Sequence, residues 1–207
     1  MCRFGNSSDW EECRVPTQPI RLLQQHEQKV VPIEHGAKVL DIDPAAITSR
    51  ILEAGSEQVS APKLLRRYVY HIVPGDMSKW IRLRDTGTES TLCIKEITSD
   101  AIDGTHEVET VVGDFAATNE LLALMGFTPK SYQENRRTSF TLDGARLELD
   151  EWPQIPSYLE IEGDSREDVV RLAGLLGYAE HQLTGENTMK VYARYGIELS
   201  GIQELRF

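Results

Sequence analysis

The chain has few cysteines and no long apolar segment, and both shortages narrow its class. Its 207 residues include three cysteines, Cys2, Cys13 and Cys93, without any C-x-x-C spacing. This odd count predicts neither a disulfide framework nor a thiolate zinc site. No apolar run approaches the roughly 20 residues of a membrane span, and residues 1–6 lack the basic-then-apolar order of a signal peptide. We therefore expect a cytoplasmic protein without a membrane partner.

Positive charge is also scarce. The chain carries 22 lysines and arginines against 33 aspartates and glutamates, which gives a formal net charge of -11. This balance argues against binding to long nucleic acids, which requires a broad basic field. The sequence has no glycine-rich phosphate loop and no G-x-S-x-G elbow. Four histidines show no metal-ligand spacing: His35, His71, His106 and His181.

What recurs instead is an alternation of charged and apolar residues. Residues two apart share one face of a strand, so each such segment has a charged face and an apolar face. A single segment of this kind is typical of any half-buried sheet, but several with both signs of charge favour a closed or strongly curved sheet with a charged interior. That interior predicts a site for a polyanion held with metal ions, the alternative being a tunnel of purely structural salt bridges. The segments are 80–84, 93–95, 107–109, 146–150 and 160–162.

The order of elements predicts one α+β domain over residues 30–207, preceded by a polar extension over residues 1–29 that is a mobile tail or a short surface helix. Capping residues mark two helices: Asp43 and Pro44 begin one that ends at Gly55, and Asp114 begins one that ends at Gly126. A third helix is expected from Ser165 to Leu176 and a short fourth one after Glu186. Strands are expected near 30–42, 59–73, 79–85, 91–98, 107–109, 136–142, 145–150 and 158–162.

The dipeptide Asp143-Gly144 predicts a tight hairpin and fixes its register. Counting outward from Leu142 opposite Ala145 places Arg137 across from Asp150 and Ser139 across from Glu148. Arg137 should therefore point into the charged interior, whereas its neighbour Arg136 should point outward.

Taken together, these segments resemble the CYTH superfamily, the triphosphate tunnel metalloenzymes, which includes class IV adenylyl cyclases, thiamine triphosphatases and inorganic triphosphatases. The resemblance covers about residues 30–195 and implies a closed eight-stranded antiparallel barrel with helices packed outside. The matching motifs are Trp80-Ile81-Arg82-Leu83-Arg84, Thr91-Leu92-Cys93-Ile94-Lys95-Glu96, Arg136-Arg137, Ala145-Arg146-Leu147-Glu148-Leu149-Asp150-Glu151-Trp152 and Tyr158-Leu159-Glu160-Ile161-Glu162-Gly163.

The resemblance also implies roles for individual residues. Lys38, Arg82, Arg84 and Lys95 would be catalytic and, with Arg137 and Arg146, would bind the triphosphate. Mg²⁺ or Mn²⁺ would be held by Glu34, Glu148, Asp150, Glu160 and Glu162, with Glu107 and Glu109 completing the lining. The chain departs from the family's Glu-x-Glu-x-Lys strand at Gly36, which removes one oxygen ligand.

We expect a metal-dependent phosphohydrolase acting on tripolyphosphate, thiamine triphosphate or a nucleoside triphosphate. A class IV adenylyl cyclase, which makes cyclic AMP and pyrophosphate from ATP, is one alternative. It is less favoured because no adenine pocket is apparent in the sequence and the His-Phe pair before the first strand of typical class IV cyclases is missing. A non-catalytic triphosphate sensor, suggested by Gly36, is the other alternative. A homodimer is left open.

Overall fold

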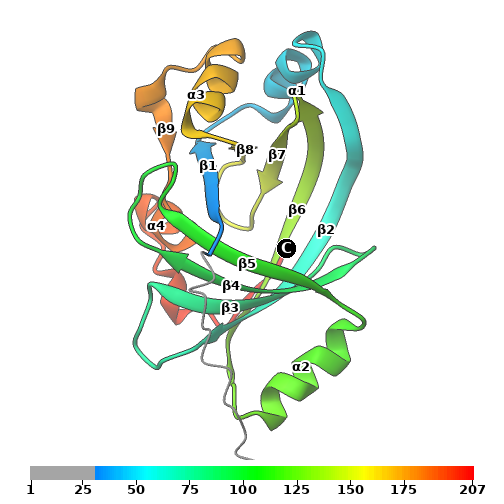
Figure 1. The fold of residues 1–207 in the computed structure, drawn as a ribbon, viewed down its shortest axis with the longest axis vertical. Coiled ribbons are helices and arrows are strands. Elements are labelled where there is room, and N and C mark those ends of the chain that lie inside the picture. Colours follow the sequence, from blue (N-terminus) through cyan, green and yellow to red (C-terminus); the bar gives the residue numbers. More distant parts are fainter. Residues whose placement is uncertain (1–30) are drawn as a thin grey trace, which may run out of the picture. The chain divides into compact units, whose positions relative to one another are not determined.

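The computed structural model describes residues 31–207, so the expected extension over residues 1–29 lies outside the described part. Eight antiparallel strands close into a barrel in the order β6-β2-β3-β4-β5-β1-β8-β7, with β7 pairing back to β6. This confirms the predicted α+β barrel (Figure 1). The strands are β1 (Ile33–Val39), β2 (Glu57–His71), β3 (Lys79–Asp85), β4 (Ser90–Ile97), β5 (Thr105–Val112), β6 (Pro129–Leu142), β7 (Ala145–Glu151) and β8 (Tyr158–Gly163).

Helices and short strands lie outside this barrel. Within residues 31–207 there are four α-helices: α1 (Pro44–Glu53), α2 (Phe115–Leu124), α3 (Arg166–Leu175) and α4 (Thr188–Arg194). Single turns of 3-10 helix occupy Glu180–Gln182 and Leu199–Gly201, β9 (Leu183–Thr184) pairs with β1, and β10 (Glu204–Leu205) pairs with β6. None of the described helices is both long and apolar enough to span a membrane.

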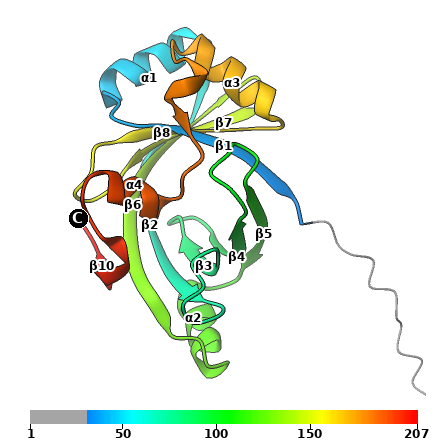
Figure 2. The same cartoon turned by 90° about the vertical axis from the view of Figure 1, so that its left-hand side faces the viewer.

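The joins between neighbouring strands differ greatly in length. The long strands β2 and β6 lie side by side along the whole barrel, as Figures 1 and 2 both show. In contrast, β1 and β5 share only two register pairs among the described residues, Ile33 with His106 and Glu34 with Thr105. The barrel is therefore closed most weakly between β1 and β5.

The apolar faces of β1, β7 and β8 pack outward against helices, as the alternation predicts, whereas Ile94 of β4 and Val108 and Val111 of β5 remain exposed. Helices α1 and α3 cover β1, β7 and β8 at one end of the barrel (Figure 2). Ile47 and Ile51 of α1 and Val169 and Leu172 of α3 are buried in this core. Each such side chain contributes roughly 1.5–3 kcal/mol on leaving water. The charged faces are thereby left to the inside of the barrel.

The predicted helix caps are confirmed, but three residues of the predicted apolar stripes are not buried. Asp43 accepts hydrogen bonds from the Ala45 and Ala46 amides at 2.9 Å. Leu52 in α1, Leu121 in α2 and Met125 just after α2 are 46%, 59% and 65% exposed. The reason is that each helix touches the barrel along a narrower stripe than the apolar pattern suggests.

The hairpin around Asp143-Gly144 has the predicted register. Leu142 pairs with Ala145, and Arg137 pairs with Asp150. Asp143 and Gly144 both have positive φ values, 51° and 83°, as a two-residue turn of this type requires. Arg136 points outward and lies 4.1 Å from the centroid of the Phe207 ring.

Candidate functional site

The charged faces of the strands enclose one cavity of about 810 Å³. This is within the usual size range of small-molecule sites. All eight strands of the barrel contribute charged side chains to its walls, and β2 and β6 also contribute several neutral ones. The charged lining residues include Glu34, Lys38, Arg82, Arg84, Lys95, Glu107, Glu109, Arg137, Arg146, Glu148, Glu160 and Glu162.

Three arginines gather where β2 meets β3. Arg67 of β2 lies directly opposite Arg84 of β3 in the ladder, and Arg82 is two residues further along the same face. Like charges placed opposite each other destabilise a sheet. Burial and the nearby Arg82, Arg84 and Arg137 lower the pKa of Arg67 to about 9, so this guanidinium is still charged at neutral pH.

These arginines are incompletely satisfied by the protein. The Nε–H groups of Arg67, Arg82 and Arg84 are all buried without a hydrogen-bond partner in the described part of the chain. Arg67 donates through Nη2 to Asn135 and stacks 4.7 Å from the centroid of the Trp152 ring, yet no carboxylate of residues 31–207 forms a salt bridge with it. Of the three, Arg82 and Arg84 line the cavity, so an anion placed there would lie beside their guanidinium groups.

Glutamates of β5 hold the other donors of these arginines and a lysine. Arg82 Nη2 contacts Glu107 Oε1 and Glu109 Oε2, each at 2.8 Å. Burial opposes the charge of Arg82, but the two carboxylates outweigh it and raise its pKa. Lys95 bridges Glu107 and Glu34 with two contacts of 2.7 Å. These pairs fix the cationic heads in the cavity.

Glu160 lies on the opposite wall, and the buried Asp150 lies close to it because both accept hydrogen bonds from Arg137. Burial alone would raise the pKa of Glu160, but Lys38 at 2.8 Å and Arg137 at 2.9 Å hold it well below its usual range. Asp150 is fully buried, and its two oxygens accept from Arg137 at 2.7 and 2.6 Å, with Asn135 adding a third bond at 2.8 Å. Asp150 therefore anchors Arg137 from behind and does not line the cavity.

Two further carboxylates on this wall have raised pKa values, because burial disfavours their charged forms. Burial raises the pKa of Glu162, and Glu160 and Glu34 raise it further, although Arg146 forms an ion pair with it. Burial also raises the pKa of Glu148, which accepts a hydrogen bond from Ser139 at 2.6 Å. A group of oxygen donors that repel one another is stabilised by a hard divalent cation. The donor set of this wall fits Mg²⁺ or Mn²⁺.

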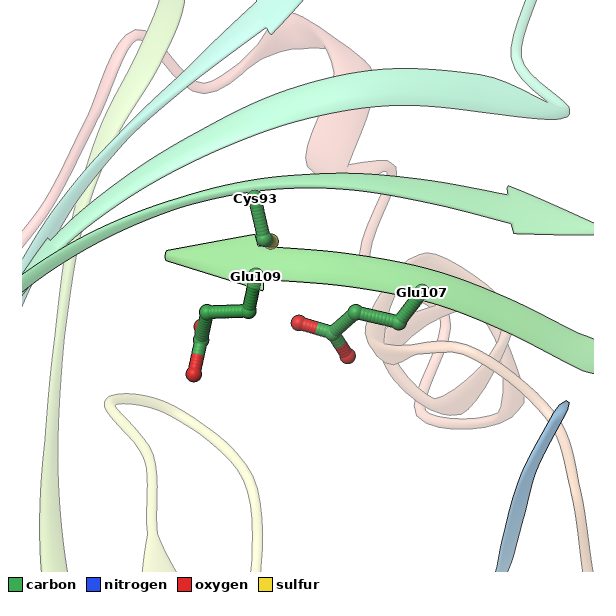
Figure 3. A group of neighbouring side chains, drawn as sticks. All are labelled: Cys93, Glu107 and Glu109. Carbon is green, nitrogen blue, oxygen red and sulfur yellow. The ribbon is translucent and has the colours of Figure 1, made fainter. Parts of the chain in front are cut away.

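Within residues 31–207, the one group whose ligand atoms all lie within 4.8 Å of one another is Cys93, Glu107 and Glu109 (Figure 3). Burial raises the pKa of the Cys93 thiol to about 12, so it is protonated at neutral pH. Both glutamates already accept from Arg82. A protonated thiol is a poor partner for a hard cation, and this group is better described as the anchor of Arg82.

Comparison with solved structures identifies the barrel. A candidate adenylate cyclase from Vibrio parahaemolyticus superposes with a TM-score of 0.66 at 15% identity, covering 78% of this chain and 98% of that one. The PH1012 protein of Pyrococcus horikoshii gives 0.64 at 20% identity, with 75% and 96% covered. The Hippeastrum protein HpAC1, a candidate adenylyl cyclase described as having a dominant triphosphatase activity, gives 0.55 at 17% identity, with 79% and 96% covered.

The chain has the CYTH fold. At these identities the likeness is one of fold alone. No protein-family model and no curated protein sequence matches the chain. The barrel fold that the predicted resemblance implies is thus confirmed.

The CYTH fold brings together nearly all the residues expected in the site. The six expected triphosphate-binding residues line the cavity, as do four of the five expected metal ligands; the exception is Asp150. Gly36 also lines it, and a Cβ built there would meet Glu162 Cγ at 3.6 Å, an ordinary contact. Nothing in the surrounding packing requires glycine at this position.

Arg67 is the main buried charge beside the site that the sequence does not reveal, and it does not itself line the cavity. Its strand contains Lys63, Arg66 and Arg67, so charges fall on both faces and the alternation is broken. Arg66 pairs with Asp85 on the outside, whereas Arg67 turns inward. The one available signal was the adjacent pair of arginines in a strand rich in apolar residues, which requires one of them to face the interior.

Proposed function

We propose that this barrel binds a triphosphate in its cavity and hydrolyses it with a divalent metal ion. The observation that carries the proposal is the group of cationic side chains that lines the cavity, among them Arg82, Arg84 and Arg137. Guanidinium groups match phosphate oxygens in geometry and charge, so a polyphosphate would satisfy these donors. Because the net charge of the chain is -11, this local concentration of cations does not follow from overall composition and points to an anionic ligand.

The cationic residues would hold the phosphate chain from two sides. Arg82, Arg84 and Lys95 lie on one wall of the cavity, and Lys38 and Arg137 lie on the wall of Glu160. Each of these heads is fixed by at least one carboxylate, which limits the reorganisation needed when a ligand enters. Preorganised donors of this kind stabilise charge that develops in a transition state.

Four carboxylates would hold the metal ion: Glu34, Glu148, Glu160 and Glu162. A bound Mg²⁺ or Mn²⁺ supplies neutralisation of phosphate charge and a bound water of lowered pKa. Glu162 and Glu148, whose pKa values are raised by burial, are the residues of this group with the most to gain from a cation. Arg146 would then release Glu162 and be free to contact the phosphate.

Two functions other than hydrolysis are alternatives for this barrel. An adenylyl cyclase would use a similar set of cations but must place the ribose hydroxyl in line with the α-phosphate. HpAC1, a candidate adenylyl cyclase of this fold, has a dominant triphosphatase activity. A binding protein without turnover is motivated by Gly36, which leaves β1 with one carboxylate fewer than the family pattern.

Product analysis separates these functions. The protein is incubated with ATP, tripolyphosphate or thiamine triphosphate in the presence of Mn²⁺, and the products are separated by anion exchange. We expect orthophosphate from at least one of the three, with loss of product in Arg82→Ala and retention in Arg136→Ala, whose side chain lies outside the barrel. Cyclic AMP with pyrophosphate and no orthophosphate would establish the cyclase, and tight binding without any product would establish the sensor.

A further inference from the structure

One inward-facing arginine of β2 lies beside the cavity without lining it. Arg67 has the same place in the alternation of the strand as four residues that do line the cavity: Lys63, Leu65, Val69 and His71. Arg67 itself is only 7% exposed and does not belong to the lining. A ligand in the cavity would therefore not touch Arg67, and this residue can orient a ligand only through other side chains.

Keeping this charge buried is unfavourable for the fold. Burial is the main reason that the pKa of Arg67 is lowered to about 9. Buried ions are normally paired with an opposite charge, yet no carboxylate of residues 31–207 forms a salt bridge with Arg67. An apolar side chain would fill the same space at a lower cost. Packing alone therefore does not account for an arginine at this position.

Two neighbours fix the direction of the Arg67 guanidinium. Its Cζ lies 4.7 Å from the centroid of the Trp152 ring, and its Nη2 donates to Asn135 Oδ1. Asn135 is fully buried, and its Nδ2 donates to Asp150 Oδ1 at 2.8 Å. A guanidinium only donates and a carboxylate only accepts, so the amide of Asn135 has a single favourable orientation between them. Arg67 thereby determines which end of this amide faces Asp150.

The same carboxylate holds Arg137, which does line the cavity. Asp150 Oδ1 accepts from Arg137 Nε at 2.7 Å as well as from Asn135, and Asp150 Oδ2 accepts from Arg137 Nη2 at 2.6 Å. If the amide of Asn135 turned over, its carbonyl oxygen would face Asp150 Oδ1 and repel it. The carboxylate and the guanidinium paired with it would then move together. Arg67 is thus connected to the cavity wall by a continuous series of hydrogen bonds.

We propose that Arg67 is a positioning residue for the triphosphate site: through Asn135 and Asp150 it sets the direction in which Arg137 presents its guanidinium to the ligand. The inference rests on the proposed function. A small misplacement of a group that binds or orients a ligand has a large effect, because the fit of donors to acceptors is directional. Loss of the donor at Arg67 should therefore weaken ligand binding although no contact with the ligand is removed.

Calorimetry with tripolyphosphate in EDTA tests the proposal without turnover. We expect Arg67→Met to weaken binding by about tenfold or more, and Arg67→Lys, which keeps a cation that only donates, to retain most of the affinity. Arg66→Met is the matched control and should bind as the wild type does, because Arg66 pairs with Asp85 outside the barrel. The double variant of Arg67→Met with Arg137→Lys should bind no more weakly than Arg137→Lys alone. Additive losses would show that Arg67 acts independently of Arg137, which overturns the positioning role.

Nuclear magnetic resonance tests the same inference on the protein without ligand. The Nε–H signal of Arg137, assigned through Arg137→Lys, should move in Arg67→Met and stay near its wild-type position in Arg67→Lys and Arg66→Met. If Arg67→Met does not fold, Asn135→Leu interrupts the same series of hydrogen bonds and should have the same two effects. An unmoved signal, or an unchanged affinity for tripolyphosphate, overturns the positioning role while leaving the triphosphate function intact. Failure of the wild type to bind tripolyphosphate overturns both.

Discussion

Replacing Arg137 tests the site and the fold in one variant. This guanidinium makes contacts of 2.7 and 2.6 Å with Asp150, and one of 2.9 Å with Glu160. Because Asp150 is fully buried, Arg137→Ala leaves a carboxylate without its counter-ion in the interior. Breaking a buried pair in this way costs roughly 3–5 kcal/mol of unfolding free energy. The neighbouring Arg136→Ala should cost only about 1 kcal/mol, the worth of an exposed contact between a cation and an aromatic ring.

Urea unfolding followed by circular dichroism measures both values, with Arg136→Ala as the matched control. A double variant, Arg137→Met with Asp150→Asn, removes both charges and should recover a large part of the loss. Tripolyphosphate affinity is measured in parallel on the variants that remain folded, and it should fall for Arg137→Ala and not for Arg136→Ala. Equal destabilisation by the two alanine variants would refute the register argument, and no recovery in the double variant would refute the role assigned to Asp150.

Three other perturbations have defined outcomes. Gly36→Glu should add an oxygen ligand beside Glu162 and shift the midpoint of Mn²⁺ activation of turnover to a lower metal concentration. Gly36→Gln, of the same size, should not shift it. Equal behaviour of the two variants would exclude a ligand role. Arg82→Ala and Arg84→Ala should each lower kcat/KM, by an amount that corresponds to a loss of about 2 to 4 kcal/mol of transition-state stabilisation. Full activity of both variants would show that the phosphate binds elsewhere. The pKa of Glu162 in the folded protein lies above the ordinary value of 4.5. The free energy of unfolding therefore declines as the pH rises above 4.5 and Glu162 loses its proton in the folded protein. Without metal, the Tm of Glu162→Gln relative to wild type should therefore increase across that window, and a decrease would contradict the raised pKa.

Local patterns in the sequence were sufficient to predict most of the barrel. The turn at Asp143-Gly144 and the alternation on either side of it determine which side chains face inward, so Arg137 and Glu148 are placed correctly without any tertiary information. Helix caps are equally local, and Asp43 and Ser165 begin their helices as expected.

The remaining features depend on tertiary packing. Asp150 has the alternation of a lining residue, but the hydrogen bond from Asn135 and the depth of Arg137 remove it from the cavity wall. Arg67 lies in a strand whose alternation is broken by Lys63 and Arg66, so its inward direction has no signature within one window of sequence.

Because β1 and β5 share only two register pairs among the described residues, ligand binding should change how stably the barrel is closed between them. Across it, Lys95 holds Glu34 of β1 and Glu107 of β5, so its ammonium supplements two register pairs. Local opening of a protein begins where few hydrogen bonds must break, and amides at this seam should exchange with solvent by opening at less than the free energy of global unfolding. A polyanion that contacts Lys95 competes with these carboxylates, whereas a cation at Glu34 replaces the lysine as their partner. The Glu107 amide donates to the Pro32 oxygen across this seam at 3.2 Å, and its exchange should accelerate when the polyanion enters first and slow when the cation does.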